Sequence, residues 1–215
     1  MPASVVVTTA EVDLEGTLAV DERDAVATAL PERRAEFVTG RVLGRRALAV
    51  MGLGPGSIPV ARSGAPVWPA GVVGTITHCA GLRACAVGRR QDHAGIGIDA
   101  TPAHPLPEGV LARVADLRDA TVAAGLEALW RSGVESPDSV LFAAAEAVAK
   151  ARTAAHGGWF GIDGADVALR PDGSFTVRAR RGPVFTGTGR WVLDRGRALA
   201  GIALAEHGSR CAGAR

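Results

Sequence analysis

Two carboxylates and the single lysine of the chain form the most informative set of reactive side chains. Asp99 closes the run Gly95-Ile-Gly-Ile-Asp99, whose pattern predicts a β-strand that ends in a carboxylate. Glu146 and Lys150 lie four residues apart in an alanine-rich run, so a helix would place them on one face. Two carboxylates can hold Mg²⁺, and a nearby ammonium can neutralise phosphate. This combination is typical of a site that moves a phosphoryl group.

Lys150 is unusual because the other 23 of the 24 lysine and arginine side chains are arginine. An ammonium is a compact point charge and a guanidinium is a wide planar fork, so a lone lysine suggests a position where the fork does not fit. The alternative is an ordinary pair with Glu146, worth about 0.3–0.5 kcal/mol to a helix. For Asp99, the alternative is a turn residue that caps its own backbone.

A second group of side chains could bind phosphate. Thr75-Ile-Thr-His78 follows a Gly-rich loop at the entrance to a strand and supplies hydroxyls, N–H groups and an imidazole. The alternative for His78 is a satisfied histidine of the core. Arg34, Arg41 and Arg45 are spaced by seven and four residues, so they would share one face of a helix.

The bulk composition indicates a folded chain of one large domain or two small ones. The chain has 215 residues, of which 47% are hydrophobic. A net charge of +2 argues against bulk nucleic-acid binding. Neither a run of ~18 apolar residues nor the basic start of a signal peptide occurs, so we expect no membrane partner. Cys79, Cys85 and Cys211 lack metal-like spacing and cannot all pair, which favours the cytoplasm.

Turn residues and hydrophobic patterns predict an α+β arrangement. Helices are predicted at 31–51, 108–131 and 138–155. Strands are predicted at 4–8, 17–20, 83–87, 94–99, 165–170, 174–180, 183–186 and 190–204. Because a helix precedes strands in both parts of the chain, we expect two similar halves, 1–103 and 104–215, with a site between them. We expect the polar tail 206–215 to be frayed.

Five short runs carry a family resemblance, and they occur in family order over about residues 30–205. The runs are Arg34-Ala-Glu-Phe-Val-Thr-Gly-Arg41-Val-Leu-Gly-Arg45-Arg-Ala-Leu, Gly64-Ala-Pro-Val-Trp68-Pro-Ala-Gly, Gly74-Thr-Ile-Thr-His78-Cys-Ala-Gly, Gly95-Ile-Gly-Ile-Asp99-Ala and Leu141-Phe-Ala-Ala-Ala-Glu146-Ala-Val-Ala-Lys150-Ala. Together they resemble the larger, pseudo-dimeric class of 4′-phosphopantetheinyl transferases. The resemblance implies a monomer of two similar α/β halves with pseudo-two-fold symmetry, each a small antiparallel sheet with a packed helix.

The resemblance also implies a reaction and a role for each matching residue. The reaction would be Mg²⁺-dependent transfer of 4′-phosphopantetheine from coenzyme A to a serine of an acyl or peptidyl carrier protein in secondary metabolism. Asp99, Glu146 and Thr101 would hold the metal. Glu146 would deprotonate the serine, and Lys150 would offset charge on the departing adenosine 3′,5′-bisphosphate. Contacts to coenzyme A are implied for Arg41, Arg45, Arg62, Thr75, His78 and Lys150.

Several positions depart from the family's pattern. The family usually has a second acid where this chain has Thr101, and a lysine where it has Ala145. An expected aromatic is replaced by Pro137, and an expected basic residue falls at Ser63, with Arg62 beside it. Because Mg²⁺ often uses only one or two protein carboxylates, Thr101 could ligate the metal or hold one of its waters.

Two interpretations therefore stay open from the sequence. The chain is an active transferase, or it is a repurposed protein that binds coenzyme A thioesters or a carrier protein and catalyses a different step or none. In the second case, Thr101→Glu with Ala145→Lys should create or raise transferase activity. A nucleic-acid-binding module built on the arginines of 33–46 is disfavoured, because interleaved aromatics are scarce and the net charge is small.

Overall fold

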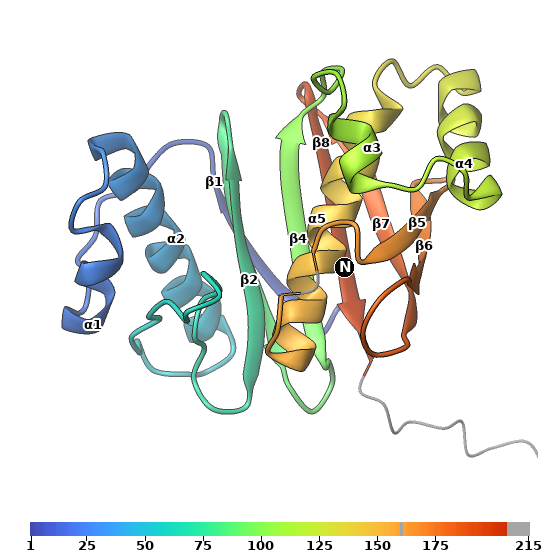
Figure 1. The fold of residues 1–215 in the computed structure, drawn as a ribbon. Coiled ribbons are helices and arrows are strands. Elements are labelled where there is room, and N and C mark those ends of the chain that lie inside the picture. The colour runs from blue at the N-terminus through green and yellow to red at the C-terminus, as the bar shows by residue number, and fades with distance from the viewer. Residues whose placement is uncertain (160, 206–215) are drawn as a thin grey trace, which may run out of the picture.

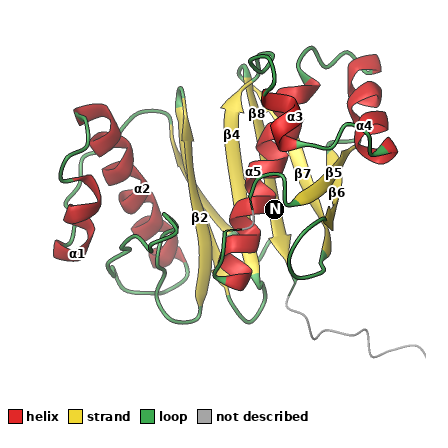
Figure 2. Cartoon of the chain, in the orientation of Figure 1, coloured by secondary structure: helices red, strands yellow, loops and turns green. Residues whose placement is uncertain are grey.

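The computed structural model describes residues 1–159 and 161–205, so the predicted frayed tail 206–215 lies outside the described residues. Two antiparallel sheets stand next to each other, and a long helix packs against each of them (Figure 1). Helices and strands are both well represented along the chain (Figure 2). The predicted α+β class with two antiparallel sheets is therefore confirmed.

The N-terminal sheet has three strands in the order β1-β3-β2. Helix α2 begins at a proline, whose fixed φ suits the first helical position, and ends before Gly52, which adopts a positive φ of 76°. Leu43, Ala47 and Leu48 of α2 pack on the sheet in one buried cluster. The elements are β1 (Val6–Ala10), α1 (Val20–Arg23), the 3₁₀ helix η1 (Asp24–Val26), α2 (Pro31–Val50), β2 (Val72–Cys79) and β3 (Leu82–Arg89).

The second sheet has five strands in the order β4-β8-β7-β6-β5. Helix α5 packs on one face of it, and the main hydrophobic core lies between them, around Leu141, Val148, Phe175 and Ile202. The elements are β4 (Gly95–Pro102), α3 (Val110–Val114), α4 (Ala120–Arg131), α5 (Pro137–His156), β5 (Ala165–Leu169), β6 (Ser174–Ala179), β7 (Thr186–Asp194) and β8 (Arg197–Leu204).

The two sheets meet where β2 lies beside β4. Backbone hydrogen bonds do not join these strands. β2 is an edge strand of the first sheet and β4 an edge strand of the second, and the two sheets stay separate. Buried side chains connect the sheets instead, in a cluster of Val5, Val73, Ala84, Ala86, Ile96 and Ile98. The predicted division after residue 103 stays a prediction, although β4 belongs to the second sheet by its hydrogen bonds.

The structure differs from four of the expected elements. Residues 17–19 form a loop and α1 begins at Val20, so the strand at 17–20 is wrong. The helix at 108–131 is two helices, and Asp119 caps the second by accepting from the N–H groups of Thr121 and Val122. The run 190–204 is two strands, β7 and β8, joined at Arg195 and Gly196, both with positive φ. The run 183–186 is not a separate strand, since β7 begins at its last residue.

Two corrections concern residues proposed for chemistry. Asp99 does not end its strand, because β4 continues to Pro102 in register with β8. Thr75 and His78 do not lie at the entrance to a strand, because β2 begins at Val72. Both sets of side chains therefore project from strand interiors, where their directions are fixed by the pleat. Within the described residues, no helix is both long enough and apolar enough to cross a membrane.

Candidate functional site

The centre of the site is a contact between three side chains from three elements. Lys150 of α5 lies with Nζ 2.6 Å from Oδ1 of Asp99 on β4. Thr77 of β2 donates its hydroxyl to the same oxygen at 2.8 Å. The Lys150 ammonium also lies 3.3 Å from the Thr77 hydroxyl and 3.4 Å from the Ile98 carbonyl oxygen. The three N–H donors of an ammonium thus face three oxygens that converge on one point.

Small residues bring Lys150 to Asp99. A Cβ atom built at Gly97 would overlap the carbonyl oxygen of Ala147, and one at Gly95 would overlap that of Ala151. Two glycines on one face of β4 therefore let the backbone of α5 lie directly on the strand. Lys150 then reaches across to the carboxylate two residues further along that face.

Glu146 lies one helical turn before Lys150 and is half-buried. Burial raises the pKa of its carboxyl; the Lys150 charge opposes this shift and the Asp99 charge adds to it. Within the described residues Glu146 accepts no hydrogen bond and has no salt bridge. The ordinary Glu146–Lys150 helix pair therefore does not form, because the lysine is engaged by Asp99.

His78 forms a chain of contacts with two residues of α2. The NH1 group of Arg33 lies 2.8 Å from Nε2 of His78, and Oε1 of Glu36 lies 3.2 Å from Nδ1. Because a guanidinium only donates, Nε2 must accept, so the proton of the neutral ring sits on Nδ1, the nitrogen that faces Glu36. Burial lowers the pKa of His78; the Glu36 charge opposes the shift, and the Arg33 charge adds to it.

Arg41 is 6% exposed and lies in the wall of the site. Its Nε donates to the Ile58 carbonyl oxygen at 3.1 Å, and its guanidinium carbon lies 3.6 Å from the centre of the Phe37 ring. Burial lowers the pKa of Arg41 to about 10, while Glu22 opposes the shift. The side chain therefore remains cationic at neutral pH.

Arg45 has a different environment from Arg41. Its guanidinium forms a salt bridge with the fully buried carboxylate of Glu22, which also accepts from the backbone N–H groups of Ala19 and Ile58. Four residues along a helix carry a side chain about 6 Å along the axis. The structure therefore does not bring Arg45 to the Asp99 contact, although both arginines belong to α2.

Two adjoining cavities surround the Lys150 side chain. The smaller one, about 250 Å³, is named the polar pocket and is lined by Arg33, Glu36, Phe37, Arg41, Gly64, Pro66, Ile76, Thr77, His78, Asp99 and Lys150. The larger one, about 490 Å³, is named the apolar pocket. Trp68, Thr75, Glu146, Lys150 and Trp159 are among its lining residues. Because both pockets include Gly64, Pro66, Ile76 and Lys150, an extended ligand could occupy the two together.

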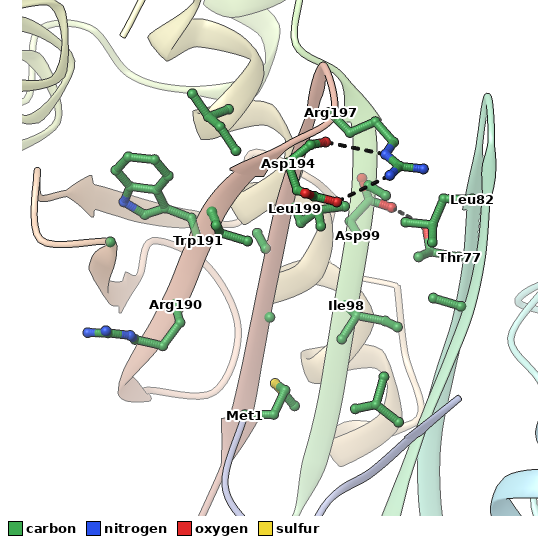
Figure 3. A pocket seen from close by; sticks show the side chains of 18 of the residues that line it. Met1, Thr77, Leu82, Ile98, Asp99, Arg190, Trp191, Asp194, Arg197 and Leu199 are labelled. Atoms are coloured by element: carbon green, nitrogen blue, oxygen red, sulfur yellow. Dashed lines mark hydrogen bonds and ion pairs between the residues drawn. The ribbon is translucent and has the colours of Figure 1, made fainter. Parts of the chain in front are cut away.

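A third cavity lies behind the same side chains. It is named the rear cleft, has a volume of about 910 Å³, and opens between the two sheets. Ile98 and Ala100 of β4 line it, on the face of that strand opposite the glycines that contact α5. Thr77 and Asp99 line both the rear cleft and the polar pocket, and Figure 3 shows them from the cleft side.

The remaining predicted site residues are placed as follows. Thr75 is buried and lines the apolar pocket. Thr101 lies two residues beyond Asp99 on the same face of β4 and is partly exposed. Arg62 is exposed and lines neither pocket. Ala145 is only 2% exposed and packs in the core between α5 and the second sheet, away from Glu146.

The carboxylates give this site its capacity for a metal ion. Both donors to Asp99 bind Oδ1, so Oδ2 accepts no hydrogen bond from the described residues. Glu146 is likewise unbonded, and hard carboxylate oxygens suit Mg²⁺. A set of three or more His, Cys, Asp or Glu side chains in metal-binding arrangement is absent from the described part of the chain. Any ion here would therefore need waters or ligand oxygens in addition.

Sequence reasoning missed three contributors to the site. Thr77 lies two residues after Thr75, so alternation along the strand puts both on the same face. The sequence pattern therefore does not show which of the two threonines contacts Asp99. Arg33 was overlooked because Arg34 gave the better spacing with Arg41. Phe37 carried a usable signal, since it lies four residues before Arg41 and could stack on it.

Comparisons with known proteins identify similar sequences. The family model described as 4′-phosphopantetheinyl transferase N-terminal domain matches residues 21–88. Over 86% of its length, the chain is 44% identical to 4′-phosphopantetheinyl transferase Svp of Streptomyces mobaraensis, covering 78% of that protein. It is 36% identical to PptT of Mycobacterium tuberculosis, covering 85%, and 34% identical to Npt of Nocardia iowensis, covering 88%, again over 86% of this chain.

Proposed function

Because this chain belongs to the 4′-phosphopantetheinyl transferase family, we propose that it uses Mg²⁺ to transfer phosphopantetheine to carrier proteins of secondary metabolism. Membership itself makes the chain an enzyme of this type, with coenzyme A as its substrate. The metal, the acyl or peptidyl carrier protein, the metabolic role and the residue roles are the proposal. One observation supports the metal and the residue roles: Asp99, Glu146 and Lys150 lie together beside two adjoining pockets.

Coenzyme A would occupy the polar and apolar pockets together. Arg41 and His78 line the polar pocket and could contact phosphates, while Thr75 and Lys150 line the apolar pocket. Mixed cationic and apolar walls suit a ligand with a charged nucleotide end and an uncharged pantetheine arm. Contacts from Arg45 and Arg62 stay predictions from the family resemblance, since neither residue lines these pockets.

Mg²⁺ fits the oxygen donors of the site. We propose that Asp99 and Glu146 hold it, with Thr101 supplying a hydroxyl or an ordered water, and that substrate phosphate completes the shell. The open Oδ2 of Asp99 and the unbonded Glu146 support this assignment. When bound, the ion would neutralise charge on the pyrophosphate of coenzyme A.

The residues of the chain then divide the proton and charge transfers between them. Glu146 accepts the proton of the carrier serine, directly or through water. The serine oxygen bonds to the β-phosphorus as the bond from that phosphorus to the bridging oxygen breaks. Adenosine 3′,5′-bisphosphate leaves with the electron pair, and Lys150 offsets its charge and can protonate it.

The remaining partners follow from the same proposal. The chain would act as a monomer, because the two sheets that border the site belong to one molecule. A cytoplasmic location is proposed because its three cysteines cannot all pair. Neither nucleic acid nor a membrane is required as a partner. A net charge of +2 supports the absence of a nucleic-acid partner.

The test is intact-protein mass spectrometry of an apo carrier protein incubated with the chain, coenzyme A and Mg²⁺. We expect the carrier to gain one phosphopantetheine unit, with release of adenosine 3′,5′-bisphosphate. Chelation should abolish the gain, and Glu146→Gln should slow it at least roughly 100-fold, because the base is lost without a change of shape. Failure to modify any acyl or peptidyl carrier at any Mg²⁺ or Mn²⁺ concentration would refute the proposal.

A further inference from the structure

The hydrogen bonds of Asp99 are distributed unequally between its two oxygens. Oδ1 accepts from both Thr77 and Lys150, at 2.8 and 2.6 Å, while Oδ2 accepts from neither. The Thr77 hydroxyl also lies 3.3 Å from the Lys150 ammonium, which can only donate. That hydroxyl therefore accepts from Lys150, and its own proton is donated to Asp99.

Two side chains hold the Asp99 carboxylate, Lys150 from the helix of the second sheet and Thr77 from the first sheet. No backbone ladder joins β2 to β4, so Thr77 and Asp99 meet across a gap between the two sheets. The rear cleft opens on the far side of this gap, and both side chains border it (Figure 3). Thr77 is therefore the one side chain among the described residues that holds the Asp99 carboxylate from the first sheet.

We propose that Thr77 is the positioning residue of the metal site. Its hydroxyl fixes the rotamer of Asp99 so that Oδ1 stays with Lys150 and Oδ2 remains open for a metal ion. This inference rests on the proposed Mg²⁺-dependent function. A residue that orients a metal ligand typically contributes 10–100-fold to metal affinity, although it never touches the ion. The contribution matters here because Thr101 stands where the family usually has a second acid after Asp99.

The test measures metal binding directly. Mn²⁺ is titrated into the chain saturated with coenzyme A, and the free aqueous ion is followed by electron paramagnetic resonance, with coenzyme A alone as the blank. Thr77→Val keeps the shape and removes the hydroxyl, so we expect Mn²⁺ affinity to fall about 10-fold or more. Thr77→Ser keeps the hydroxyl and should stay within about 3-fold of the original chain. Thr9→Val, at another threonine lining the rear cleft, should change neither metal affinity nor transfer.

Further comparisons separate positioning from simple structural damage. If Thr77→Val does not fold, the comparison uses Thr77→Ser and Thr77→Ala instead, because these two variants differ only by the hydroxyl. In transfer assays the concentration of Mg²⁺ giving half-maximal rate should rise about 10-fold in the variant without the hydroxyl, while the KM for coenzyme A stays unchanged. Equal Mn²⁺ affinity with and without the hydroxyl overturns this inference. If the unsubstituted chain still modifies carriers in that case, the proposed function stands and only this inference fails. If the unsubstituted chain modifies no carrier, both the proposed function and this inference fail.

Discussion

At the scale of single residues, Lys150 shows why one lysine persists among 23 arginines. Its Nζ meets the Asp99 carboxylate, the Thr77 hydroxyl and the Ile98 carbonyl within 3.4 Å. A tetrahedral ammonium can direct its three hydrogens to three such acceptors, whereas the donors of a guanidinium lie in one plane. The sequence suggested that a fork does not fit here, and the contact geometry supplies the reason.

We therefore expect Lys150→Arg to lower the rate of carrier modification clearly, although the substitution keeps the positive charge. The rate of carrier modification should fall roughly 10–100-fold, because a hydrogen bond to a charged group contributes about 1.5–3 kcal/mol. Lys150→Met, which keeps the length and removes the charge, should fall at least as far. Equal turnover by the arginine variant and the original chain would show that charge alone is required at this position.

His78 provides a pH dependence at the same scale. Its pKa in the folded chain lies below the ordinary value of 6.5, chiefly because of burial. Above about pH 7.5 both the folded and unfolded chains carry neutral imidazole, so the residue contributes no pH dependence there. As the pH falls through 6.5, the unfolded chain takes up the proton first, and folding becomes less favourable.

The corresponding variant is His78→Gln, which cannot be protonated. Between pH 7.5 and pH 5, the melting temperature of the original chain should fall more steeply than that of the variant. The other histidines are present in both chains and cancel in the comparison. Parallel melting curves across this range would mean that burial and the nearby Arg33 charge do not hold the ring neutral.

At the scale of elements, the packing of α5 on β4 determines where the reactive groups stand. Gly95 and Gly97 permit backbone contact, and Ala147 and Ala151 complete it on the helix side. We expect Gly97→Val to destabilise the fold by about 1–3 kcal/mol, because the new side chain would overlap a backbone oxygen that cannot rotate away. It should also separate Lys150 from Asp99 and remove most transferase activity.

Chemical denaturation and carrier modification measure the two effects of that substitution. Gly54→Ala is a matched control, since a Cβ there meets no atom within 4 Å and its φ is not positive. The control should retain stability within about 0.5 kcal/mol. Full stability of the Gly97→Val chain would contradict the close contact between helix and strand.

Elements also show how far the sequence could be followed. The long helices α2 and α5 were predictable because proline, glycine and apolar spacing mark them strongly. The end of β4 was not, because its extension past Asp99 depends on pairing with β8, about a hundred residues later. Glu146 and Lys150 could be found as a pair, but the partner of the lysine is a tertiary contact. Ala145 could be recognised as a departure, while its burial in the core required the structure.

At the scale of the whole molecule, the site exists only where the two sheets meet. Thr77 comes from the first sheet, and Asp99 and Lys150 come from the second sheet and its helix. The buried cluster around Val73, Ala86 and Ile96 holds the sheets together without a shared ladder. A change that separates the two sheets at this cluster would therefore also disrupt the site.

The division of the chain into halves can be tested at this joint. A fragment of residues 1–103 keeps β4 but loses β8 and α5, so it exposes unpaired backbone along the strand and the apolar side chains of Ile96 and Ile98. We expect it to lack a cooperative unfolding transition by circular dichroism. Mixing it with 104–215 should restore slow amide exchange in β4, because the partner fragment supplies the missing ladder.

A shorter fragment, 1–94, separates the two possible positions of the boundary. It retains the complete three-stranded sheet and α2 but ends before β4, so it leaves no strand unpaired. If hydrogen bonding defines the structural unit, 1–94 should be more soluble and more protected from amide exchange than 1–103, despite being shorter. If instead 1–103 alone unfolds cooperatively, β4 gains enough from its side-chain packing on β2 to belong to the first half, and the division after residue 103 is the physical one.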